Sequence, residues 1–191
     1  MKQFRCVIYC LIVLSFSSVF AQPVTRFAAI GDYGRWYTEG EALVSQMVHG
    51  WNPEFIITLG DNNYEFGADS TIDSNIGQFY HDYIRPYFGV FGNEAPFNKF
   101  FPSLGNHDWY SDSASAYLNF FTLPGNERYY DFIKGNCHFF VIDSDPNEPD
   151  GILQHSTQAL WLKSRLSQSN ARFKIVYFHH PPYSSGQHGN N

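Results

Sequence analysis

Four short apolar segments of the chain each end in a residue that can bind a metal ion. Short apolar runs bounded by polar residues are typical of buried strands, and the carboxyl ends of parallel strands meet at one edge of a sheet. We therefore expect the four ends to lie at one edge of one sheet and to form a single metal-centred site. The segments cover residues 27–30, 55–59, 100–104 and 174–178 and are followed by Gly31-Asp32, Gly60-Asp61, Gly105-Asn106-His107-Asp108 and His179-His180.

The motifs at these four positions resemble those of a known enzyme family. They are Gly-Asp-x-Gly at 31–34, Gly-Asp-x-x-Tyr at 60–64, Gly-Asn-His-Asp at 105–108 and His-x-Pro at 180–182. They look like four of the five ligand blocks of the purple acid phosphatases, which belong to the calcineurin-like metallophosphoesterases. Their order and spacing resemble the small, mammalian-type tartrate-resistant enzymes. Two details favour this branch, since Gly34 stands where most other metallophosphoesterases have a histidine ligand, and Tyr64 is present.

The resemblance implies a binuclear centre of Fe(III) and a divalent metal, which is Fe, Zn or Mn. Asp32 and Tyr64 would bind Fe(III), Asp61 would bridge the two metals, and Asn106 and His180 would bind the divalent metal. This division makes chemical sense, because carboxylate and phenolate oxygens suit a hard trivalent ion, whereas an amide oxygen and an imidazole suit a divalent one.

The adjacent histidines 179 and 180 are not expected to bind the metal together. Neighbouring residues on an extended segment point to opposite faces, so only one of them can be a ligand. His180 has the His-x-Pro spacing with Pro182, and we therefore expect His179 to lie in the core or behind the ligands.

The fifth ligand block of the family, Gly-His-x-His, does not occur in the chain up to Asn191. In the family this block supplies one histidine to each metal. We therefore expect the sequence to be a fragment, because the protein would otherwise be a poor metal binder.

Two histidines are expected to act in catalysis rather than in metal binding. His107 follows Asn106, and Asp108 could fix its tautomer, while His188 corresponds to a family histidine downstream of the His-x-Pro block. The implied reaction is hydrolysis of phosphate monoesters at acidic pH by a metal-bound hydroxide, with one of these histidines protonating the leaving alkoxide. The alternatives are a phosphodiesterase or nucleotide pyrophosphatase of the same superfamily, and a non-enzymatic secreted protein with a degenerate metal site.

Residues 1–21 have the pattern of a secretory signal peptide, with Lys2 and Arg5 before an apolar stretch that ends in Val19-Phe20-Ala21. The mature domain is then 22–191, and we expect it to be secreted, periplasmic or lysosomal. Without the leader it has 12 − 2 = 10 basic and 18 acidic side chains, a formal charge of 10 − 18 = −8. We expect a small phosphate-ester substrate, no nucleic acid and no membrane contact after cleavage, and we leave the oligomeric state open.

The alternation of strands and helices predicts a mixed α/β (α+β layered) fold in which two sheets form a β-sandwich flanked by helices. The resemblance also implies this αββα arrangement. We expect the fold to be incomplete at its carboxyl end. We expect helices at 38–49, 69–88, 113–121 and from Ser156 to Leu166, and a hairpin formed by 129–134 and 137–142. Cys137 is expected to be a buried thiol and the acidic loop 143–151 a solvated connection. Side chains expected to face the core are Leu43, Met47 and Val48 in the first helix and Leu160, Trp161 and Leu166 in the last.

Overall fold

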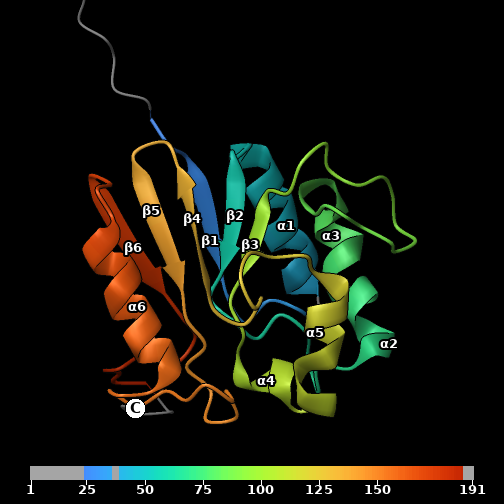
Figure 1. The fold of residues 1–191 in the computed structure, drawn as a ribbon. Helices are drawn as coiled ribbons and strands as arrows, with labels where there is room; N and C mark the ends of the chain where they lie inside the picture. Colours follow the sequence, from blue (N-terminus) through green and yellow to red (C-terminus); the bar gives the residue numbers. More distant parts are fainter. Residues whose placement is uncertain (1–23, 36–38, 187–191) are drawn as a thin grey trace, which may run out of the picture.

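The computed structural model describes residues 24–35 and 39–186, so the expected leader and His188 lie outside the described part of the chain. Two three-stranded sheets are flanked by helices (Figure 1). One sheet contains β1 (Phe27–Ile30), β2 (Phe55–Thr58) and β3 (Phe100–Pro102), all parallel. The other contains β4 (Tyr130–Lys134), antiparallel to β5 (Cys137–Val141), and β6 (Phe173–Tyr177), parallel to β5. The predicted two-sheet α/β fold and its hairpin are confirmed.

The expectation that all four site segments leave one sheet is wrong. The first three segments follow β1, β2 and β3, but the fourth follows β6, which belongs to the second sheet. A parallel pair needs a long crossover, and α6 (Thr157–Gln168) provides one that returns the chain beside β5. The two sheets together therefore build the site.

Aromatic rings fill the space between the two sheets. Phe55 of β2 packs edge-to-face on Phe139 of β5, with ring centroids 5.3 Å apart. Phe101 of β3 stacks on Phe132 of β4 at 4.0 Å. Such pairs stabilise a core beyond their buried area, and all four residues of β2 are buried, as expected for this strand. The free thiol of Cys137 is also buried, as predicted.

Helix α1 (Glu39–Trp51) forms where a helix was predicted, but it buries a different face. Leu43 and Met47 are 56% and 48% exposed. The buried residues are Glu41, Ser45 and Val48, which recur at spacings of four and three and so lie on one side of the helix. Only Val48 of the three predicted core positions is correct.

The predicted helix over 69–88 is shorter and is not regular. It consists of α2 (Asp69–Ile72), a π-helical turn (Asp73–Gly77), α3 (Gln78–Tyr80) and a 3₁₀ turn (His81–Tyr83). Ala68 precedes the helix without a side-chain cap, so the predicted cap at Ser70 or Thr71 is wrong. The helix ends before Arg85 because the residue before a proline disfavours helical geometry.

The remaining helices are α4 (Asn106–Trp109), α5 (Ser115–Phe120), which follows a 3₁₀ turn (Asp112–Ala114), and α6. Ser156 caps α6 as predicted, since its side chain accepts a hydrogen bond from the Ala159 amide. Leu160 is 55% exposed, contrary to expectation, and the fully buried residue of α6 is Gln158. None of the helices described for this chain is long and apolar enough to cross a membrane.

The acidic loop 143–151 is not solvated, contrary to expectation. Asp143, Asp145 and Glu148 are all buried. Arg128 binds Glu148 with its Nε and Asp150 with its Nη2, at 3.0 and 2.9 Å. Burying a charged carboxylate is costly unless it is paired, and Arg128, twenty residues earlier in the chain, supplies the partner of Glu148.

Candidate metal centre

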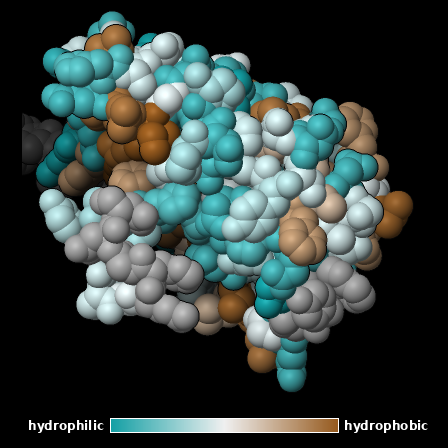
Figure 2. All heavy atoms as spheres, turned by 90° about the horizontal axis from the view of Figure 1, so that it is seen from below, coloured by the Kyte–Doolittle hydropathy of each residue, from teal (hydrophilic) through white to brown (hydrophobic). Residues whose placement is uncertain are grey.

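The segments that follow β1, β2, β3 and β6 meet at one end of the molecule. Figure 2 looks onto this end, where the central surface is mainly hydrophilic. A cavity of about 530 Å³ opens here. It is lined by Asp32, Asp61, Tyr64, Asn106, His107, Tyr110, His179, His180, Pro181, Ser184 and Gly186. All five residues predicted as metal ligands therefore line one cavity.

Asp61 lies at the centre of the site and is only 3% exposed. Its Oδ1 accepts a hydrogen bond from the backbone N–H of His107 at 2.9 Å. Its Oδ2 lies 2.8 Å from the hydroxyl of Tyr64, which is also 3.1 Å from Oδ1 of Asp32. Burial, followed by the two carboxylates, raises the pKa of Tyr64. The geometry brings together the three oxygen ligands that were assigned to the trivalent metal.

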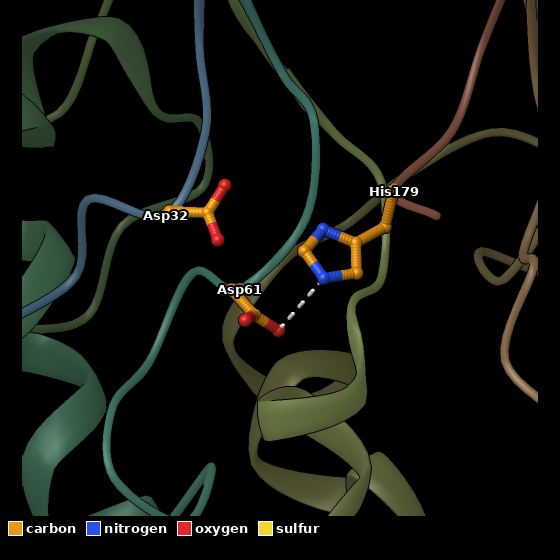
Figure 3. A group of neighbouring side chains, drawn as sticks. All are labelled: Asp32, Asp61 and His179. Carbon is orange, nitrogen blue, oxygen red and sulfur yellow. Dashed lines mark ion pairs between the residues drawn. The ribbon is translucent and has the colours of Figure 1, made fainter. Parts of the chain in front are cut away.

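His179 points toward the same carboxylate (Figure 3). Its Nδ1 lies 2.7 Å from the carbonyl oxygen of Leu59, which can only accept a hydrogen bond. Nδ1 therefore carries a proton, and in the neutral ring it is Nε2 that has the free lone pair. Nε2 lies 3.5 Å from Oδ1 of Asp61 and 3.2 Å from Oδ1 of Asn106. Ligand atoms of Asp32, Asp61 and His179 all lie within 4.8 Å of one another.

These groups fit a metal ion because the neutral form of the site would place several lone pairs close together. With His179 neutral and protonated on Nδ1, its Nε2 and the Oδ1 atoms of Asp61 and Asn106 are all acceptors. The Nδ2 of Asn106 donates to the Tyr110 hydroxyl at 2.8 Å, and this bond turns Oδ1 toward the cavity. Imidazole, carboxylate and amide oxygen form a ligand set that suits a divalent transition metal.

His180 was predicted as the ligand, but the described contacts of its ring lie elsewhere. Its Nδ1 is 2.9 Å from the Ser144 hydroxyl, which also accepts its backbone N–H at 3.0 Å. Burial, and then the neighbouring His179, lowers the pKa of His180. The spacing His179-x-Pro181 satisfies the same motif as His180-x-Pro182. The sequence thus contained a signal for His179, and the structure brings this residue rather than His180 to the carboxylates.

His107 also has a fixed tautomer, but Asp108 does not fix it. The Nδ1 of His107 lies 2.6 Å from the carbonyl oxygen of Glu65, and its Nε2 lies 3.9 Å from Oδ2 of Asp61. Asp108 is instead buried, and it accepts the backbone N–H groups of Asn62 and Gly105 at 3.1 and 2.9 Å. Burial raises the pKa of Asp108 to about 6. The predicted contact between Asp108 and the His107 ring is wrong, and the Glu65 carbonyl takes its place.

Two glycines are required by close approaches at the site. Gly60 has φ +87°, and a Cβ built there would lie 2.7 Å from the His179 ring. A Cβ on Gly34 would lie 1.6 Å from the carbonyl oxygen of Asn62. No side chain fits at position 34 with this backbone, so this position cannot supply a ligand.

A residue that the sequence reasoning missed supports Tyr64. Asn75 is fully buried in the π-helical turn, and its Nδ2 lies 2.8 Å from the carbonyl oxygen of Tyr64 and 2.7 Å from Oδ1 of Asn63. The wider π-helical turn buries Asn75, Ile76 and Gly77 in succession. Turns of this kind are frequent at functional sites, but no motif in the sequence marks one.

Comparison with known proteins gives matches over nearly the whole described chain. A family model described as calcineurin-like phosphoesterase matches residues 25–191. Tartrate-resistant acid phosphatase type 5 of Oryctolagus cuniculus is 26% identical over 202 residues, which cover 88% of this chain and 60% of that protein. Purple acid phosphatase 17 of Arabidopsis thaliana is 28% identical over 193 residues, covering 85% of this chain and 54% of that protein.

A solved structure agrees with these sequence matches. The purple acid phosphatase isolated from yellow lupin (Lupinus luteus) seeds superposes with a TM-score of 0.66 at 15% identity, over 88% of this chain and 32% of that chain. At this identity the likeness shows the fold. The chain spans about 60% of the length of the mammalian relatives that it matches.

Proposed function

Because the chain belongs to the calcineurin-like phosphoesterase family, we propose that it acts as an acid phosphatase that hydrolyses phosphate monoesters. The proposal rests on the close approach of Nε2 of His179 to Oδ1 of Asp61 and Oδ1 of Asn106. The Tyr64 hydroxyl, which lies between the carboxylates of Asp32 and Asp61, adds a further oxygen ligand. The names of the relatives, tartrate-resistant and purple acid phosphatases, support this substrate class.

We propose that the site holds Fe(III) and a divalent Fe, Zn or Mn. Asp32 and Tyr64 would hold the trivalent ion and Asp61 would bridge the two. Asn106 and His179 would hold the divalent ion, with His179 in place of the predicted His180 because its Nε2 faces Asp61. When bound, the metals would activate water and supply positive charge for the phosphoryl group.

The other groups of the site position the reactants and move protons. The Glu65 carbonyl holds the proton of His107 on Nδ1, so Nε2 is free to take up a second proton and give it to the leaving alkoxide. The backbone N–H of His107 orients Asp61. His188, which lies outside the described residues, remains the second candidate for this acid. We further propose that a cleaved leader at 1–21 directs the protein to a secreted, periplasmic or lysosomal location.

The test compares two neighbouring histidines in protein expressed from the intact gene. We expect His179→Ala to lower bound divalent metal and hydrolysis of an aryl phosphate together. His180→Ala, which loses the Ser144 hydrogen bond, is expected to keep its metal. Metal content is measured by mass spectrometry, and activity on mono-aryl and bis-aryl phosphate is compared at acidic pH.

Three outcomes would count against the proposal. A wild-type protein with full metal occupancy that hydrolyses no phosphate ester would support the non-enzymatic alternative. Faster hydrolysis of the bis-aryl phosphate would support the phosphodiesterase alternative. Loss of metal in His180→Ala but not in His179→Ala would return the ligand role to His180.

A further inference from the structure

The connection between the turn ending at Tyr83 and β3 exposes apolar side chains. Phe88 and Val90 are 87% and 86% exposed, and the following Phe91 is 40% exposed. Figure 1 shows this connection, in yellow-green, running out beyond α3 before it returns to β3. Single exposed apolar residues are common on protein surfaces, but here two stand on either side of Gly89 in a projecting turn. We call residues 88–90 the apolar tip.

Hydrogen bonds from the helical segment fix the conformation of the tip. Asp73 accepts the Tyr87 hydroxyl with Oδ1 at 2.6 Å and the Val90 N–H with Oδ2 at 3.0 Å. The Tyr87 hydroxyl accepts the N–H of Phe91 at 3.2 Å. A Cβ on Gly89 would lie 2.0 Å from Oδ1 of Asp73, so the turn packs closely on this carboxylate. These hydrogen bonds offset the entropy cost of ordering the turn. Its apolar side chains nevertheless remain exposed to solvent.

We propose that the apolar tip inserts into the lipid–water interface of a membrane and binds the protein there peripherally. A bilayer provides no hydrogen-bond partners in its apolar part, so a segment that enters it needs its polar groups satisfied internally. The backbone N–H groups of Val90 and Phe91 meet this condition. Of the charged groups around the tip, Arg85 and Glu94 form an ion pair at 2.6 Å, and the Asp73 carboxylate accepts the Tyr87 hydroxyl and the Val90 N–H.

The size of the tip favours insertion over a contact with a second copy of the chain. The exposed parts of Phe88, Val90 and Phe91 amount to roughly 400 Å² of apolar surface, given about 150–250 Å² for a large apolar side chain. A stable protein interface buries about 800 Å² on each partner. The tip together with Phe91 covers only about half of that area, whereas insertion needs a small projecting surface rather than a wide flat one.

The charge of the protein indicates the kind of lipid. The whole chain has a formal charge of −6, so its overall field disfavours an anionic membrane surface. Binding through the tip is therefore apolar and is expected on zwitterionic phosphatidylcholine. It is also expected to be insensitive to salt, unlike binding through basic residues.

The tip and the metal centre lie at different ends of the first sheet. The connection that carries the tip enters β3 at Phe100, whereas the site residues follow the other end of the strand at Gly105. A protein held by its tip would keep the cavity accessible to soluble substrates. This proposal departs from the sequence-based expectation of no membrane contact, and it does not depend on the proposed phosphatase activity.

The experiment measures cosedimentation of the full chain with phosphatidylcholine vesicles. We expect the wild type to bind and the double variant Phe88→Ser/Val90→Ser to lose roughly 100-fold in partitioning, about tenfold for each side chain. The matched control is Leu153→Ser, which removes another apolar side chain that is 77% exposed, and it should bind like the wild type. Circular dichroism checks that the variants fold alike.

A second measurement does not rely on the loss of binding. In Phe88→Trp, the fluorescence of the new indole is compared with and without vesicles that carry brominated acyl chains, and added quenching relative to the wild type supports insertion. Equal binding of the wild type and the double variant would overturn the proposal, as would no binding by the wild type or an unquenched indole. A dimer that the double variant abolishes, without vesicle binding, would assign the tip to a second copy of the chain instead.

Discussion

Glu41 gives the sharpest test of the energetics, because its carboxyl is buried in α1 and its pKa is strongly raised. It is 4% exposed, and the effect of burial on its pKa outweighs the opposite effect of a hydrogen bond from the Arg35 backbone. Burial raises its pKa from the ordinary 4.5 to about 8. The folded protein therefore holds this proton at pH values where the unfolded chain has lost it.

The sign of the effect follows from proton linkage. Between the two pKa values the native state binds more protons than the unfolded state, so the free energy of unfolding falls as pH rises. Between pH 4.5 and pH 7 the free energy of unfolding falls by about 1.36 kcal/mol for each pH unit. Over about 2.5 units this amounts to about 3 kcal/mol. Glu41→Gln has no such proton, so it should be more stable than the wild type at pH 7 by up to about 3 kcal/mol.

The assay is denaturant unfolding of the wild type and Glu41→Gln at several pH values from 4.5 to 7.5. The stability difference between the two proteins should grow with pH and level off near pH 8. Glu39→Gln, an exposed glutamate in the same helix, is the matched control and should show no such growth. A difference between Glu41→Gln and the wild type that stays constant across this range would refute the reasoning.

Three further substitutions test the site. Tyr64→Phe should remove the phenolate-to-iron charge-transfer absorption of the metal-loaded protein, and a retained purple band would exclude Tyr64 as a ligand. His107→Ala should lower kcat more than metal content, because its ring lines the cavity and is not one of the proposed metal ligands. An unchanged rate would argue against its role as an acid. Asn75→Ala should destabilise the fold by about 2 kcal/mol, since it removes a buried side chain that donates to the Tyr64 carbonyl, whereas Asn170→Ala at the exposed surface should change stability little.

The four motifs indicated the family, and all four contribute residues to the lining of one cavity because each follows the end of a strand. The resemblance to purple acid phosphatases is confirmed by the matched relatives. The positions of Asp32, Asp61 and Tyr64 follow from local turns and so could be predicted from short stretches of sequence. The choice between His179 and His180 could not, because both have a proline two residues later and only the turn after β6 decides which ring faces Asp61.

The errors in the predicted fold concern contacts between distant residues. The composition of loop 143–151 indicates solvent, but two residues from other parts of the chain hold it. Arg128 binds the Glu148 carboxylate, and the Gln158 side chain bonds the backbone N–H and carbonyl of Asp143. The helical pattern over 69–88 continues past the point where Arg85 precedes a proline. On α1 the apolar residues Leu43 and Met47 follow a helical period, yet the buried face carries Glu41, and hydrophobicity alone cannot foresee a buried carboxyl.

The hydrogen bond between Leu59 and His179 joins residues 120 positions apart, and it links the end of the first sheet to the end of the second. Closing so long a loop is slow compared with forming a helix or a hairpin, so contacts of this kind form late in folding. With the leader proposed at residues 1–21, the chain would pass through the translocation machinery before this contact exists. The metal centre would accordingly be assembled after export, and its metals would come from the compartment where the protein finishes folding.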